Sequence, residues 1–117
     1  MITPEFANQF AQEWLSAWNS HDLKAILSHY ADDFEMNSPY IVAITGEPSG
    51  RLDGKKSVGQ YWAAALAKYP QLYFQLHQVL IGVQSVVIHY QGLKGMAAET
   101  FVFNQEGKVI KSIAHYE

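Results

Sequence analysis

The feature that most constrains this chain is an aromatic stripe near its N-terminus. A helix is predicted from Pro4 to Asn19, with Thr3 as its cap and Pro4 in its first turn. Large aromatic residues recur on it at every fourth position: Phe6, Phe10, Trp14 and Trp18. Helical geometry places such residues on one broad face, and a face this wide must be buried, most naturally against a β-sheet.

The rest of the chain supplies two more helices and the strands of that sheet. Apolar residues with helical spacing predict helices over Asp22–Tyr30 and Lys55–Lys68, and alternation predicts a short strand over 34–38 that Pro39 stops. Glycine and proline predict a loop over Ala43–Gly54. Segments rich in Val, Ile, Phe and Tyr predict four further strands: Tyr73–Val83, Ser85–Gln91, Met96–Asn104 and Lys108–Tyr116.

This order predicts the α+β class in a single domain over residues 1–117. We expect a cone-shaped, curved sheet, mixed or antiparallel, wrapped around three N-terminal helices. The mouth of such a cone is hard to fill with side chains, so a cavity is expected there.

Composition excludes several classes of protein. The 117 residues are 49% hydrophobic and carry a net charge of −3 with no cysteine. These values argue against disorder, a nucleic-acid partner, a disulfide framework and a cysteine nucleophile. The stretch Tyr69–Leu93 lacks charged residues, but Pro70 and Gly82 break it into short pieces, so no membrane partner is expected. No signal peptide is recognised at the N-terminus. No cofactor-binding motif is recognised either, so no cofactor is expected. A cytoplasmic location is predicted.

Several motifs carry a resemblance to a known superfamily. These are TPEF, WNSHDL, YADDF, DGKKSVGQYW and FNQEGKVIKSIAHY. With them the chain resembles the nuclear transport factor 2-like superfamily, and within it the SnoaL-like and ketosteroid isomerase-related branch. The resemblance implies a cone-shaped, cystatin-like α+β roll that is usually dimeric and holds a ligand pocket.

The isomerase branch implies three catalytic groups in that pocket. The tyrosine that donates to the oxyanion matches Trp14, the aspartate base matches Ser38, and the protonated aspartate matches Glu99. Only Glu99 keeps a carboxyl group. An indole N–H can still donate a hydrogen bond, but a serine hydroxyl is a poor base unless something activates it. The base of the steroid isomerase mechanism is therefore missing.

Strand alternation independently predicts that Glu99 points inward. It shares one strand face with Ala97, Phe101 and Phe103, which are all apolar. Burial among such residues would raise the pKa of the carboxyl and make it a usable acid, base or neutral donor. The alternative is that Glu99 lies near a strand end and reaches water or a lysine.

Further residues are candidates for the site. Glu99 and Ser38 are the catalytic candidates, although the Ser38 hydroxyl could equally be satisfied by the backbone at a strand end. Plain core packing is the alternative for every aromatic residue, and it is the one we favour for Trp18. The predicted pocket wall consists of Trp14, Tyr30, Met36, Trp62, Phe101 and Tyr116.

These observations lead to two hypotheses for function. The first is a protein that binds a small apolar molecule and acts as an isomerase or cyclase by proton transfer through Glu99. The alternative is a non-catalytic interaction or assembly module of the same fold. A homodimer is expected through a convex face bearing Val102, Val109 and Ile113.

No metal site is expected. His29, Asp32 and Asp33 have helical spacing, but two aspartates after a helix are more typical of a solvated turn.

Overall fold

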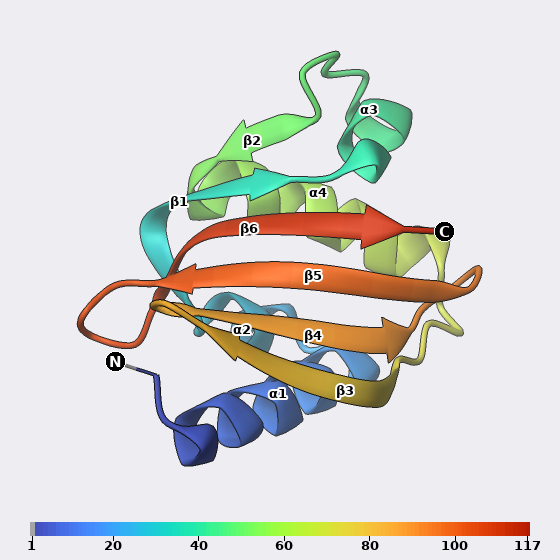
Figure 1. Ribbon diagram of the computed structural model, residues 1–117. Coiled ribbons are helices and arrows are strands. Elements are labelled where there is room, and N and C mark those ends of the chain that lie inside the picture. The colour runs from blue at the N-terminus through green and yellow to red at the C-terminus, as the bar shows by residue number, and fades with distance from the viewer. Residues whose placement is uncertain (1) are drawn as a thin grey trace.

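A six-stranded mixed sheet forms one layer of the protein and helices cover its concave face (Figure 1). The structure is a computed structural model that describes residues 2–117. Its helices are α1 (Pro4–Asn19), α2 (Leu23–Leu27), α3 (Pro39–Thr45) and α4 (Gly54–Lys68). Its strands are β1 (Tyr30–Asn37), β2 (Arg51–Asp53), β3 (Gln75–Gly82), β4 (Ser85–Gln91), β5 (Met96–Phe103) and β6 (Val109–Tyr116).

The strands lie in the order β2-β1-β6-β5-β4-β3. β1 runs parallel to β6, and every other neighbouring pair is antiparallel. This is the predicted α+β fold with a mixed sheet. No helix within residues 2–117 has the length and apolar content needed to cross a membrane.

Helix α1 has the predicted bounds and the predicted buried face. The Thr3 hydroxyl accepts a hydrogen bond from the backbone N–H of Phe6 at 3.1 Å, so the first turn is capped. Phe10, Trp14 and Trp18 are all buried against the sheet and the neighbouring helices. The aromatic stripe is therefore the main contribution of the N-terminus to the core.

The region between the second predicted helix and α4 differs from the prediction. α2 is only five residues long, and Tyr30 begins β1 instead of ending a helix. The predicted loop Ala43–Gly54 contains the end of α3 and all of β2, so residues 2–117 form four helices where three were predicted.

Proline explains the helix that the sequence prediction missed. Pro39 is predicted to stop a strand, yet proline also suits the first turn of a helix. The Ser38 hydroxyl accepts a hydrogen bond from the backbone N–H of Tyr40 at 3.1 Å and caps α3. Gly46 ends this helix with a left-handed backbone at φ +80°, which glycine adopts without strain.

One residue predicted to lie on the convex face is instead in the core. Val109 is fully buried, whereas Val102 and Ile113 are half-buried on the convex side. The pairing of β5 with β6 shifts register between Val102 and Phe103, and Ile110 is the extra residue. Such a bulge reverses the alternation beyond it, so Val109 turns inward.

Candidate functional site

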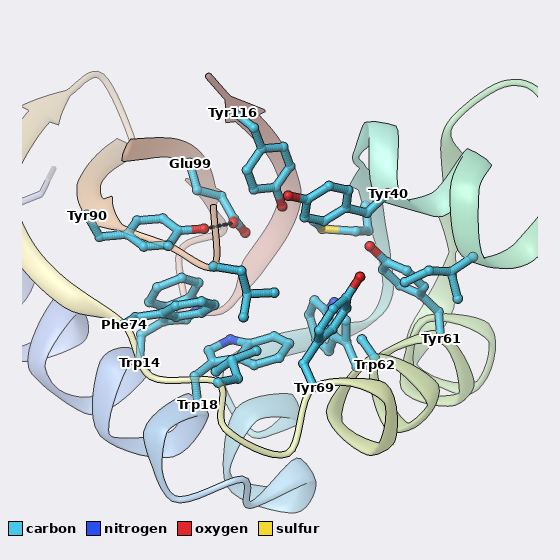
Figure 2. Close-up of a pocket in the computed structure, with 16 residues that line it drawn as sticks. Trp14, Trp18, Tyr40, Tyr61, Trp62, Tyr69, Phe74, Tyr90, Glu99 and Tyr116 are labelled. Atoms are coloured by element: carbon cyan, nitrogen blue, oxygen red, sulfur yellow. Dashed lines mark hydrogen bonds between the residues drawn. The ribbon is translucent and has the colours of Figure 1, made fainter. Parts of the chain in front are cut away.

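A mostly aromatic cavity lies between the sheet and the helices at the open end of the cone (Figure 2). Its volume is about 50 Å³. The walls come from α1, α3, α4, the sheet and the segments that follow α4 and β4. The large side chains opposite the sheet include Trp14, Trp18, Trp62 and Phe74.

Glu99 projects into this cavity from β5. Its side chain is buried, with the residue 4% exposed, as alternation along the strand predicted. The Ser112 hydroxyl donates a hydrogen bond to one carboxylate oxygen at 2.8 Å, and the Tyr90 hydroxyl donates to the other at 3.4 Å. The alternative in which Glu99 pairs with a lysine is therefore wrong.

Burial dominates the ionisation of this carboxyl group. Loss of solvent raises the pKa of Glu99 to about 7, while the hydrogen bonds from Ser112 and Tyr90 act in the opposite direction. Near neutral pH the group therefore exists in both protonation states. Such a carboxyl can accept a proton from a ligand or return one.

Tyrosines surround the remainder of the cavity. The rings of Tyr40 and Tyr116 stack with centroids 4.3 Å apart, and both residues line the cavity. Burial raises the pKa of Tyr61 to about 12 and raises the pKa of Tyr116 further. These hydroxyls therefore remain protonated at neutral pH and act as neutral donors or acceptors.

Ser38 does not line the cavity. It is buried at the end of β1, where its hydroxyl caps α3. The nearby Ser38 hydroxyl moderates the rise in the pKa of Tyr61 and of Tyr116. The position of Ser38 therefore suits the capping of α3.

The indole N–H of Trp14 is already engaged. It donates a hydrogen bond to the hydroxyl of Tyr30 at 3.0 Å, inside the core. The N–H therefore has no free direction in which to orient a ligand, although the Trp14 ring does line the cavity. The expectation that this group replaces the oxyanion donor does not fit the geometry.

Two residues of the predicted wall lie behind it. Tyr30 is buried, and its hydroxyl accepts the hydrogen bond from Trp14. Phe101 packs against Phe10, with ring centroids 4.9 Å apart. Neither is among the residues that line the cavity. Both lie on the predicted inward side of the fold, but neighbouring rings cover them.

The predicted site residues that do border the cavity are Trp14, Met36, Trp62, Glu99 and Tyr116. Among the aromatic residues of the wall, the prediction missed Trp18, Tyr40, Tyr61, Tyr69, Phe74 and Tyr90. Tyr90 could have been found, because it continues the inward alternation of Val86 and Ile88 along β4. Tyr40 could not, because it lies between the predicted strand and the predicted loop, where no helix was expected.

Trp18, predicted to be core, is both buried and part of the cavity wall. Within residues 2–117, its indole nitrogen is the one fully buried side-chain nitrogen or oxygen that lacks a hydrogen-bond partner. The Trp18 ring meets Trp62 edge-on, with centroids 5.3 Å apart.

No three histidine, aspartate or glutamate side chains gather as metal ligands anywhere in the described residues 2–117. Asp32 is exposed and lies 3.7 Å from the ammonium of Lys55.

Comparison with known proteins identifies a family. The family model of the SnoaL-like domain matches residues 11–115. A SnoaL-like protein of unknown function from Burkholderia thailandensis has 58% sequence identity, with a TM-score of 0.96 over 99% of this chain and 98% of that one.

Two more distant structures share the fold, and both were crystallised with small molecules. TerC, co-crystallised with polyporic acid, is 13% identical, with a TM-score of 0.75 over 96% of this chain and 92% of that one. A protein with a ketosteroid isomerase-like fold from Catenulispora acidiphila, in complex with trimethylamine, is 17% identical. Its TM-score is 0.72 over 99% of this chain and 88% of that one.

Proposed function

Because the chain belongs to the SnoaL-like domain family, we propose that its cavity binds a small, largely apolar molecule that presents one polar group to Glu99. One observation carries this proposal: a buried carboxyl group with a pKa of about 7 lies in a wall that is otherwise largely aromatic. The co-crystallisation of TerC with polyporic acid and the complex of the Catenulispora acidiphila protein with trimethylamine support ligand binding in this fold.

The chemistry that suits this arrangement is proton transfer, as in isomerisation or cyclisation. Glu99 is the catalytic residue of the proposal, because it can hold or release a proton beside a bound ligand. Ser112 and Tyr90 orient its carboxyl group through their hydrogen bonds. Ser38 acts indirectly, as a positioning residue for α3.

A second candidate function is binding or assembly without turnover. Two observations favour it: the Trp14 N–H is occupied by Tyr30, and the cavity volume is about 50 Å³. Ligand sites typically measure roughly 300–1,000 Å³. In this alternative, Glu99 helps to select a ligand or a partner and carries out no reaction.

Fluorescence titration with phenol tests the proposal, because three tryptophans border the cavity. We expect phenol to change the tryptophan emission of the wild type, with an affinity that varies between pH 5.5 and 8.5. Glu99→Gln should bind without that pH dependence, since its amide does not titrate. Glu106→Gln, in the exposed turn before β6, is the matched control and should behave as the wild type.

Identical affinities and identical pH profiles for the wild type and Glu99→Gln would remove Glu99 from the function. Turnover of an enolisable ketone by the wild type, lost in Glu99→Gln, would favour the enzyme. Binding without turnover would favour the second candidate.

We also propose that the protein is a homodimer in the cytoplasm. The half-buried Val102 and Ile113 lie on the convex side of the sheet, and β3 adds the exposed Leu80. Sedimentation velocity at micromolar concentration should show a dimer that Ile113→Glu dissociates, and a monomeric wild type would refute this. Cell fractionation tests the compartment, which the absence of cysteine permits.

A further inference from the structure

The formal charge on the cavity wall is negative. Among the residues that line it, Glu99 is the one that carries a formal charge, and no lysine, arginine or histidine borders it in the described chain. Figure 2 shows the hydroxyls of Tyr40, Tyr69 and Tyr116 directed toward the space between the rings. Phenolic oxygens can accept hydrogen bonds, so the wall complements a ligand that is positive or rich in donors, and it disfavours an anion.

Among residues 2–117, no cationic side chain pairs with the ionised Glu99. Its two hydrogen-bond donors, Ser112 from β6 and Tyr90 from β4, are neutral. The other titratable groups that face it are Tyr30 of β1, Tyr61 of α4 and Tyr116 of β6. Burial raises the pKa of each of these phenols, so they remain uncharged. A buried carboxylate without an opposite charge is costly, and a cation in the cavity would supply that charge.

Aromatic rings line the same space. Trp14 and Trp18 lie with centroids 6.2 Å apart at an angle of 58°, and Trp18 meets Trp62 at 5.3 Å. Phe74 lies 5.8 Å from Trp14, nearly parallel to it. Differently oriented aromatic rings around a small space attract a cation through their electron-rich faces, and tryptophan is the strongest of them.

The size of the cavity limits the cation. A single water needs roughly 10–15 Å³ of such space, and the cavity provides about 50 Å³. It therefore accepts a compact group of a few heavy atoms and excludes a fused ring system unless its walls move.

From the aromatic lining, the single carboxylate and the small volume, we infer that the polar group recognised in this cavity is an alkylated ammonium, with Glu99 as its counter-ion. This inference rests on the proposed ligand-binding function and names the chemical class of its ligand. Methyl groups on the nitrogen contact the rings, while the charge faces the Glu99 carboxylate.

Tetramethylammonium chloride tests the inference, because its charge does not depend on pH. Tryptophan emission is followed during titration at pH 8.0 and pH 5.5, with sodium chloride at equal ionic strength as the salt control. We expect at least tenfold weaker binding at pH 5.5, because protonation of Glu99 removes the counter-ion. tert-Butanol, a neutral molecule of similar shape, should bind more weakly and equally at both pH values.

Variants complete the test. Glu99→Gln should lose most of its affinity for tetramethylammonium and keep its affinity for tert-butanol, and Glu106→Gln should bind both as the wild type does. Retained tetramethylammonium affinity in Glu99→Gln would overturn the inference. Binding of phenol or tert-butanol without tetramethylammonium would overturn the inference and leave the proposed function intact. No response to any of the three probes would count against both.

Discussion

Two inward positions on the same strand have opposite roles. Glu99 and Phe101 lie two residues apart on β5, point to the same side of the sheet and are both buried. Phe101 packs edge-on against Phe10 at 4.9 Å and against Trp14 at 5.3 Å. Glu99 faces the cavity and hydrogen-bonds to Ser112 and Tyr90.

The difference lies in what each side chain meets across the core. Phe10 reaches the sheet opposite Phe101 and Phe103, and Phe6 adds a further edge-on contact to Phe103 at 5.1 Å. That end of the cone is closed by aromatic rings. Opposite Glu99, the indoles of Trp14 and Trp18 leave about 50 Å³ unfilled. Burial of Phe101 at the closed end stabilises the fold. Burial of Glu99 at the open end raises the pKa of its carboxyl group and lowers the stability of the protein.

The largest expected effect is at the closed end. Phe101→Ala should lower the free energy of unfolding by about 3–5 kcal/mol, because it removes a buried ring that its neighbours cannot replace. Urea denaturation followed by circular dichroism measures this change. Thr100→Ala, half-buried on the opposite face of β5, is the control and should lie within about 1 kcal/mol of the wild type. A loss below about 1 kcal/mol for Phe101→Ala would show that this end is not closed as described.

The next largest effect is a pH dependence of stability, which we expect from Glu99 at the open end and not from Phe101 at the closed end. The pKa of Glu99 is about 7 in the folded protein against 4.5 for a free glutamate, so the folded state keeps this proton to higher pH than the unfolded state does. Stability therefore falls as pH rises from 4.5 to 7 and then levels off, a difference of about 3 kcal/mol. Glu99→Gln should remove this slope and be the more stable protein at pH 8. The same slope in both proteins, measured by urea midpoints from pH 4.5 to 8, would contradict the assignment.

The smallest effect concerns the hydrogen bond from Ser112 to Glu99. Ser112→Ala removes a 2.8 Å bond that stabilises the carboxylate, so the pKa of Glu99 should rise above about 7. Stability at pH 8 should fall by about 1–2 kcal/mol. A carbon-13 NMR titration of the glutamate carboxyl carbons measures the pKa. Tyr90→Phe, whose bond is longer at 3.4 Å, should shift it less, and an unchanged pKa in Ser112→Ala would refute the role of the bond.

Local patterns were sufficient for much of the fold. Alternation on β5 placed Glu99 and Phe101 inward, and the aromatic stripe placed Trp14 against the sheet, as the structure confirms. Both depend only on the repeat of a strand or a helix. Where a local signal had two meanings, as for Pro39 at the start of α3, the prediction failed.

Helical and strand periodicity was not sufficient to predict which residues line the cavity. Tyr30 and Phe101 were predicted to line the cavity, but neighbouring rings cover them. The Trp14 N–H was expected to be free, but the Tyr30 hydroxyl accepts its hydrogen bond. Each of these outcomes depends on which side chain meets which across the core.

The chain's own order of residues was enough to determine its class of fold, the burial of its aromatic helix and the inward direction of its acid, because these follow from periodicities that a short segment carries within itself. The tertiary structure alone decided that the cavity is small, that Glu99 meets Ser112 and Tyr90, and that a bulge at Ile110 turns Val109 into the core. Those outcomes depend on the curvature and register of the sheet, which bring together residues far apart in the chain.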